Sequence, residues 1–179
     1  MDRRDDILST SGVHVGGTDF DRQLNIAKVM PEMGLGSLTK DGKRHLPVWY
    51  FNDMATWHKI NLLYTPKTMR DIAALKREAA KAHKLDIYEH LLENRSGHRL
   101  AAQVESAKIE LTDAMDAVIS LVEPGLSLQV PVTRREFDLS SAELTTKIDV
   151  AMGEALQQAG VTAAEMAILP ERCKQVLFS

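Results

Sequence analysis

Residues 117–133 read AVISLVEPGLSLQVPVT, and this stretch predicts a β-hairpin. In its second half, residues 126–133, apolar residues alternate with others, which is typical of a strand with one buried face. The dipeptide Pro124-Gly125 is typical of a turn between that strand and residues 117–123. Pro131 has no N–H to give to a ladder, so we expect it on an edge strand. The sequence therefore predicts a small antiparallel sheet.

The segments around the hairpin carry helical patterns. Residues 98–115 place apolar side chains three and four residues apart, which predicts a helix with one core-facing stripe. Thr65-Pro66 joins a capping residue to a proline at the first helical position and predicts another helix start. The fold class is therefore expected to be α+β, helix-rich with a small antiparallel sheet. The stripe of residues 98–115 consists of Leu100, Val104, Ala107, Leu111 and Ala114.

Three further helix starts rest on capping residues. Asp53 is expected to cap a helix that carries Trp57. Ser140 followed by Glu143 is a capping box, and it predicts a helix that begins there and ends at Gly160. Thr162 with Glu165 predicts a short last helix.

Length and composition exclude several classes of protein. The chain has 179 residues and a formal net charge of -3, which argues against a surface that binds nucleic acid or anionic membranes. No apolar run is long enough to span a bilayer, and the first residues do not resemble a secretory signal. Cys173 is the only cysteine, so no internal disulfide can form, which favours a reducing, cytoplasmic location.

Two segments carry a resemblance to a known family. Residues 13–21 read VHVGGTDFD, and residues 105–112 read ESAKIELT; the hairpin and residues 133–137 follow in order. This arrangement resembles the nucleotide-binding domain of the seventy-kilodalton heat-shock (DnaK-like) chaperones. The run PVWYF at residues 47–51 is closest to the divergent YegD-type proteins of that group. The resemblance implies part of an actin-like ATPase (ribonuclease H-like) α/β domain, namely subdomain IIB and part of IIA.

The resemblance implies three parts and a site for ATP or ADP. Residues 1–30 would form a strand, a Gly-Gly turn and a helix, residues 31–135 a helical subdomain with the hairpin, and residues 136–179 a return helix and a divergent tail. In the family, the second quoted segment contacts adenosine, and the glycine pair lies against the nucleotide. Taken alone, the glycine pair is typical of a tight turn, and Glu105 with Lys108 is typical of a surface pair. The implied nucleotide-binding residues are Gly16, Gly17, Glu105, Lys108, Ile109 and Thr112.

The family's two Gly-rich phosphate loops, which hold magnesium in the intact protein, have no counterpart in the sequence. Residues 167–173 also lack the glycine pair expected near the end of the domain. We therefore expect a domain fragment that does not hydrolyse ATP alone. The alternative is an assembly module that has lost nucleotide binding. The expected partners are an adenine nucleotide, an exchange-factor or co-chaperone protein, and a second copy of the chain. No catalytic residue or metal site is expected, because His83, His90 and His98 lack metal-ligand spacing.

Overall fold

Helix α5, Gly97–Glu110, buries the apolar stripe that its sequence predicts. The computed structural model describes residues 8–167 of the chain. Leu100, Val104, Ala107 and Leu111 are buried in the core cluster, which confirms the predicted face. The helix ends at Glu110, before the predicted end at residue 115, and Ala114 is half-buried in the turn that follows.

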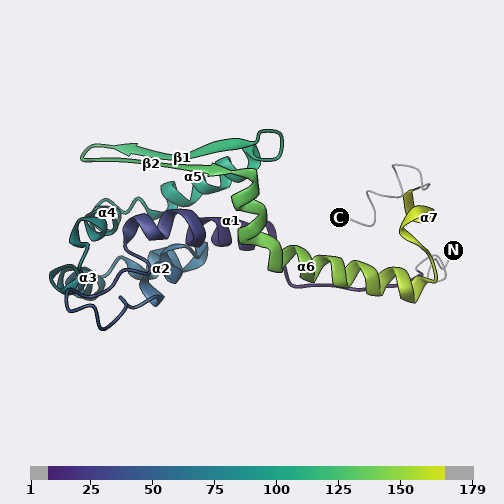
Figure 1. The fold of residues 1–179 in the computed structure, drawn as a ribbon, viewed down its shortest axis with the longest axis horizontal. Coiled ribbons are helices and arrows are strands. Elements are labelled where there is room, and N and C mark those ends of the chain that lie inside the picture. Colours follow the sequence, from purple (N-terminus) through teal and green to yellow (C-terminus); the bar gives the residue numbers. More distant parts are fainter. Residues whose placement is uncertain (1–7, 168–179) are drawn as a thin grey trace. The chain divides into compact units, whose positions relative to one another are not determined.

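The predicted hairpin is confirmed. Strand β1, Asp116–Glu123, pairs antiparallel with β2, Leu126–Thr133, and Leu121 lies opposite Leu128. Gly125 closes the turn with a φ of +85°, a conformation that favours glycine. The inner face of the hairpin lies along α5, and its alternate residues are buried there (Figure 1). The alternation in sequence therefore sets which face covers the helix.

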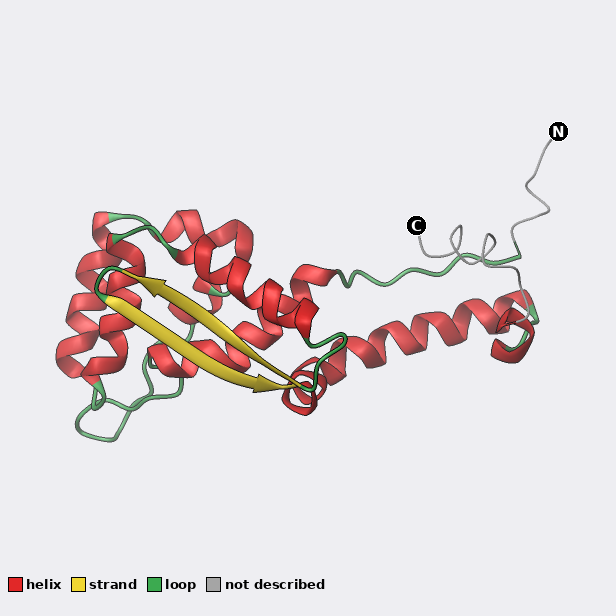
Figure 2. Ribbon diagram, turned by 90° about the horizontal axis from the view of Figure 1, so that it is seen from above, coloured by secondary structure: helices red, strands yellow, loops and turns green. Residues whose placement is uncertain are grey.

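Within the unit Gly16–Ala142, the helices before the hairpin gather on one of its faces, so the sheet forms a layer across them (Figure 2). The fold is α+β and helix-rich with a small antiparallel sheet, as predicted. Thr65 Oγ1 accepts a hydrogen bond from the Thr68 N–H at 3.1 Å, which confirms the predicted cap. The helical elements besides α5 are α1 (Gly17–Leu24), η2 (Asn25–Val29), η3 (Met30–Met33), α2 (Trp49–Met54), η4 (Trp57–Leu63), α3 (Pro66–Glu78), α4 (Ala82–Glu93), α6 (Arg134–Ala159) and α7 (Ala163–Ala167).

The predicted start of the long helix α6 is wrong. The helix begins at Arg134, and its capping box is Thr133 with Glu136. The Ser140 hydroxyl instead donates to the Phe137 carbonyl oxygen, within the helix. The sequence carries two capping boxes in succession, and the first takes effect because it follows β2 directly. At the other end, Thr162 and Glu165 form the predicted box before α7.

Two local predictions near the start of the chain differ from the structure. Asp53 lies inside α2 instead of capping the next helix, whose N-cap is Thr56. Residues 12–15 form no strand, because no described segment pairs with them and a strand needs a partner for its backbone groups. The helix expected after the glycine pair is confirmed as α1.

The chain divides into two compact units. The larger unit, Gly16–Ala142, holds the hairpin, α1 to α5 and the core. The other unit contains residues 8–15 and 143–167 of the described chain, where the Ser9 hydroxyl donates to the Ala155 carbonyl oxygen at 2.7 Å. The three-part division expected from the sequence remains a prediction, and the tail beyond Ala167 lies outside the described residues.

Candidate functional site

The predicted glycine pair lies at the start of α1. The Gly16 N–H donates to Asp19 Oδ2 at 2.8 Å, and the Asp19 N–H donates to the Gly16 carbonyl oxygen at 2.9 Å. Asp19 therefore caps this helix and also complements its positive end. Gly16 has extended backbone, with φ of −128° and ψ of 172°, which any residue can adopt.

Neither glycine is required by packing within the described chain. A Cβ atom added to Gly17 would lie 3.7 Å from Lys108 Nζ, which is an ordinary contact. A Cβ atom on Gly16 would lie 3.9 Å from Asp19 Oδ2. Backbone conformation and space therefore admit a larger residue at both positions, and glycine at position 16 also suits an N-cap.

Lys108 joins α5 to the start of α1 across 91 positions of sequence. Its ammonium nitrogen lies 3.4 Å from the Gly17 carbonyl oxygen and 2.7 Å from Asp21 Oδ1. The contact with Oδ1 is an ion pair that does not have the alignment of a hydrogen bond. An ammonium group has three donors, so these two partners leave donor capacity for a ligand.

The structure brings together only some of the predicted residues. Gly16, Gly17 and Lys108 lie at the junction of α1 and α5, and Glu105 lies there as well, because it lines the same cavity as Asp21. Ile109 is exposed, and Thr112 lies in the turn beyond α5, where its N–H donates to the Ile109 carbonyl oxygen. Within the described chain, neither of these two residues makes a hydrogen bond or ion pair to the glycine pair.

The carboxyl group of Asp21 lies in an unfavourable position for its charge. Burial raises its pKa, and the negative charge of Glu105 raises it further, while the Lys108 ammonium opposes both. Asp21 lies in the motif of residues 13–21, and the sequence alone assigned it no binding role. Its partner on α5 was not predictable from local sequence, because the two residues are far apart along the chain.

A cavity of about 130 Å³ lies beside this junction. Its polar lining comes from Thr18, Asp21, Asn25 and Glu105, and Trp57 forms part of its wall. Asn25 is only 2% exposed, and its Oδ1 has no hydrogen-bond partner among the described residues. The sequence patterns did not indicate that Asn25 is buried. Its place beside the apolar Leu24 was the one local sign of it.

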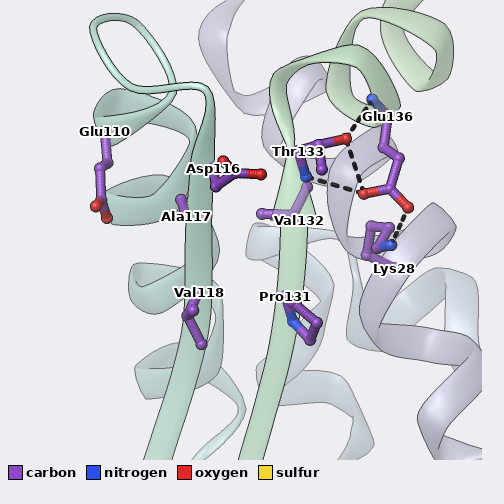
Figure 3. Close-up of a pocket in the computed structure, with 9 residues that line it drawn as sticks. All are labelled: Lys28, Glu110, Asp116, Ala117, Val118, Pro131, Val132, Thr133 and Glu136. Carbon is purple, nitrogen blue, oxygen red and sulfur yellow. Dashed lines mark hydrogen bonds and ion pairs between the residues drawn. The ribbon is translucent and has the colours of Figure 1, made fainter.

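A larger hollow of about 490 Å³ lies over the hairpin near Lys28 and Glu136 (Figure 3). Lys28 Nζ lies 2.5 Å from Glu136 Oε1, and the Thr133 N–H donates to Oε2 at 2.9 Å. These contacts lower the pKa of Glu136 to about 2, and the contact with Lys28 has the largest effect. Glu110 extends from the far side of β1, away from this pair (Figure 3). Lys28 and Glu136 are thus used at the cap of α6, which is a structural role.

A buried charge cluster lies at the hairpin turn. Glu123 Oε1 accepts from the Ser96 hydroxyl at 2.7 Å and lies 2.8 Å from His90 Nε2. Arg99 Nη1 lies 2.8 Å from Glu123 Oε2. Ser96 is fully buried, so a substrate cannot reach its hydroxyl, which serves as a donor to the Glu123 carboxylate. The cluster anchors the hairpin to α4 and α5.

Neither a metal centre nor a membrane span is found in the part of the chain that the structure describes. No three His, Cys, Asp or Glu side chains there form a group suited to a metal ion. None of the helices there combines the length and apolar composition that crossing a bilayer requires. No family model matches the chain. The resemblance to heat-shock chaperones therefore depends on the motif residues alone.

Proposed function

We propose that this chain contributes the adenosine-contacting lobe of a chaperone-like, actin-fold ATP-binding protein. The observation that carries the proposal is the contact of Lys108 with the Gly17 backbone. The resemblance assigns these two segments to one nucleotide, and their approach in space supports that assignment.

The nucleotide would lie between the α1 start and the exposed side of α5. Lys108 keeps donor capacity for a ribose hydroxyl, and Glu105 is an exposed acceptor three residues away. Ile109 presents an exposed aliphatic surface, 60% accessible, that suits the flat face of a purine. Thr112 would reach the base from the turn beyond α5. No hydrolysis is assigned to this chain, since its sequence holds no Gly-rich phosphate loop.

Titration with ATP and with ADP tests the proposal, with tryptophan fluorescence and melting temperature as readouts. Trp57 is half exposed and lies near Glu105 in the cavity wall, so it can report binding. A ligand at ten times its Kd raises the free energy of unfolding by about 1.4 kcal/mol. We expect Lys108→Met to weaken binding about tenfold, the effect of losing one charged hydrogen bond.

Lys67→Met is the matched control, because Lys67 is an exposed lysine that pairs with Asp71 on α3. It should bind ATP as the wild type does. A wild-type protein that shows no shift at millimolar ATP, or equal affinity in the two lysine variants, would contradict the proposal.

The second candidate function is a protein-assembly module derived from the same fold. Trp49 and Trp57 are 46% and 51% exposed, and Leu62 is also exposed, so these side chains offer apolar surface to a partner. An exchange-factor protein or a second copy could cover them. Concentration-dependent sedimentation without any response to ATP would favour this function.

A further inference from the structure

The ammonium group of Lys108 has a defined place at the start of α1 before any ligand binds. Its Nζ lies 2.7 Å from Asp21 Oδ1 and 3.4 Å from the Gly17 carbonyl oxygen. The Lys108 and Asp21 side chains are only 19% and 18% exposed, so surrounding atoms limit their motion. A free lysine side chain samples many rotamers, and ordering such a side chain costs free energy when a ligand binds.

Asp21 is the fixed member of this pair. It lies within α1, whose start is capped by Asp19. The next residue, Arg22, donates from Nε to Thr56 Oγ1 at 3.2 Å, which ties α1 to the N-cap of η4. Asp21 therefore belongs to an anchored helix, whereas Lys108 reaches α1 through a flexible four-carbon stem. The carboxylate sets where the ammonium group lies.

Lys108 pairs with Asp21 although a second carboxylate is close along its own helix. Glu105 lies three residues before Lys108 on α5, a spacing at which ion pairs commonly form. Among the described residues, no ion pair joins Lys108 to Glu105. The Glu105 carboxylate therefore stays available as an acceptor, and Asp21 directs the ammonium group towards the Gly17 backbone.

The stability of the fold gives no reason for a charge at Asp21. Burial raises the pKa of this carboxyl group, and although Lys108 opposes the effect, the pKa stays above its ordinary value. The ionised form is therefore less favourable in the folded chain than in the unfolded chain. An asparagine of the same shape would avoid this cost. Titratable groups in such unfavourable places are typical of functional sites.

We propose that Asp21 is a positioning residue for the nucleotide, and that it acts through Lys108 without touching the nucleotide itself. The inference rests on the proposed function and adds to it a residue to which the resemblance gave no role. Because Asp21 orders the lysine in advance, the nucleotide gains the ribose contact without the cost of ordering that side chain. The donor capacity that the ammonium group keeps is directed to a ribose hydroxyl.

ATP titrations of Asp21→Asn, followed by tryptophan fluorescence, test the proposal. We expect binding to weaken about fivefold, the effect of one long side chain that has to be ordered on binding. The melting temperature without nucleotide should stay level or rise near neutral pH, because the unfavourable charge is gone. Asp71→Asn is the matched control, since Asp71 pairs with Lys67 on α3, and it should bind ATP as the wild type does.

Two further readouts separate positioning from general damage to the structure. The first is the preference for ATP over dideoxy-ATP, which lacks both ribose hydroxyls. Asp21→Asn should reduce this preference about fivefold, whereas a damaged fold would bind both nucleotides more weakly to the same degree. The second is a double-variant cycle, in which Asp21→Asn should have no further effect on ATP binding once Lys108→Met is present.

The outcomes distinguish this inference from the proposed function. A wild-type protein that binds no ATP would overturn both. If the wild type binds ATP and Asp21→Asn binds it equally well, the inference alone is wrong. It is also wrong if the preference over dideoxy-ATP is unchanged, or if the effects of Asp21→Asn and Lys108→Met add. Should Asp21→Asn not fold, Asp21→Ser, which also removes the charge, takes its place in the same titrations.

Discussion

At the first turn of α5, the buried carboxylate of Glu123 has three side-chain partners, whereas farther along the same helix the Asp21 carboxylate has one and the Asn25 amide oxygen has none among the described residues. Glu123 meets Ser96, His90 and Arg99 within 2.7 to 2.8 Å. Near Lys108, Asp21 has one ion pair, and the buried Asn25 oxygen has no partner among the described residues. Several partners around one buried carboxylate hold it in place, although Glu123 Oε2, like Asp21 Oδ1, has an ion pair and no hydrogen bond.

The space around the two ends of α5 also differs: the first end is tightly packed, and the second end is open. A Cβ atom on Gly97 would lie 2.7 Å from Ile60 Cγ2 and 2.9 Å from Tyr64 Oη. A Cβ atom on Gly17, at the other end, would meet nothing nearer than 3.7 Å. The first end thus serves stability, and the second leaves room and charge for a ligand.

The largest expected effect comes from Glu123→Ala. Removing this carboxylate leaves the Arg99 and His90 side chains and the buried Ser96 hydroxyl without their acceptor. Breaking such a buried group of partners costs about 3–5 kcal/mol in the free energy of unfolding, measured by urea denaturation. Glu105→Ala, on α5, is the control, since the loss of an exposed carboxylate should change stability by less than about 0.5 kcal/mol. Equal losses in the two variants would contradict the comparison.

A smaller effect is expected from Gly97→Ala. The added methyl group overlaps Ile60 and Tyr64, and overpacking of this kind costs about 1–3 kcal/mol. Gly17→Ala is the matched change at the other end of α5, and its free energy of unfolding should stay within about 0.5 kcal/mol of wild type. Thermal unfolding of both variants measures the difference. A destabilised Gly17→Ala with an unaffected Gly97→Ala would reverse our assignment of the two ends.

The sequence correctly predicted those helices and strands whose patterns involve residues close together in the chain. The alternation in residues 126–133, the stripe on α5 and the cap at Thr65 each involve neighbours within one turn or one strand. The prediction of the start of α6 was wrong because the sequence contains two capping boxes. The position of Thr133 at the end of β2 decides between them, and that position is not visible in the local sequence.

The candidate site was predictable only in part. The resemblance placed Lys108 and Gly17 at one nucleotide, and the structure brings them into contact. Asn25 and the ion pair of Asp21 were missed, because burial and partners from distant segments do not show in a local pattern. The Glu123 cluster was missed for the same reason, since Ser96 and His90 are 27 and 33 positions away.

The smallest expected effect is a pH dependence at Asp21. Burial raises its pKa above the ordinary value of 3.8, so the folded chain holds this proton more tightly than the unfolded chain does. Between 3.8 and the raised pKa, the folded state binds more protons, and stability falls as pH rises. The variant Asp21→Asn carries no such charge and lacks this fall.

Melting temperatures of wild type and Asp21→Asn should therefore diverge as pH rises from about 3 to 7, with the variant relatively more stable at the upper end. The difference stays below about 1 kcal/mol, because Asp21 is partly exposed and Lys108 compensates its charge. Asp113→Asn, an exposed change beyond the end of α5, controls for the loss of one negative charge. If wild type instead gained stability over Asp21→Asn with rising pH, the Lys108 pair would outweigh the burial of Asp21. The charge of Asp21 would then already be compensated within the protein, and a ligand bound near Lys108 would gain no electrostatic stabilisation from it.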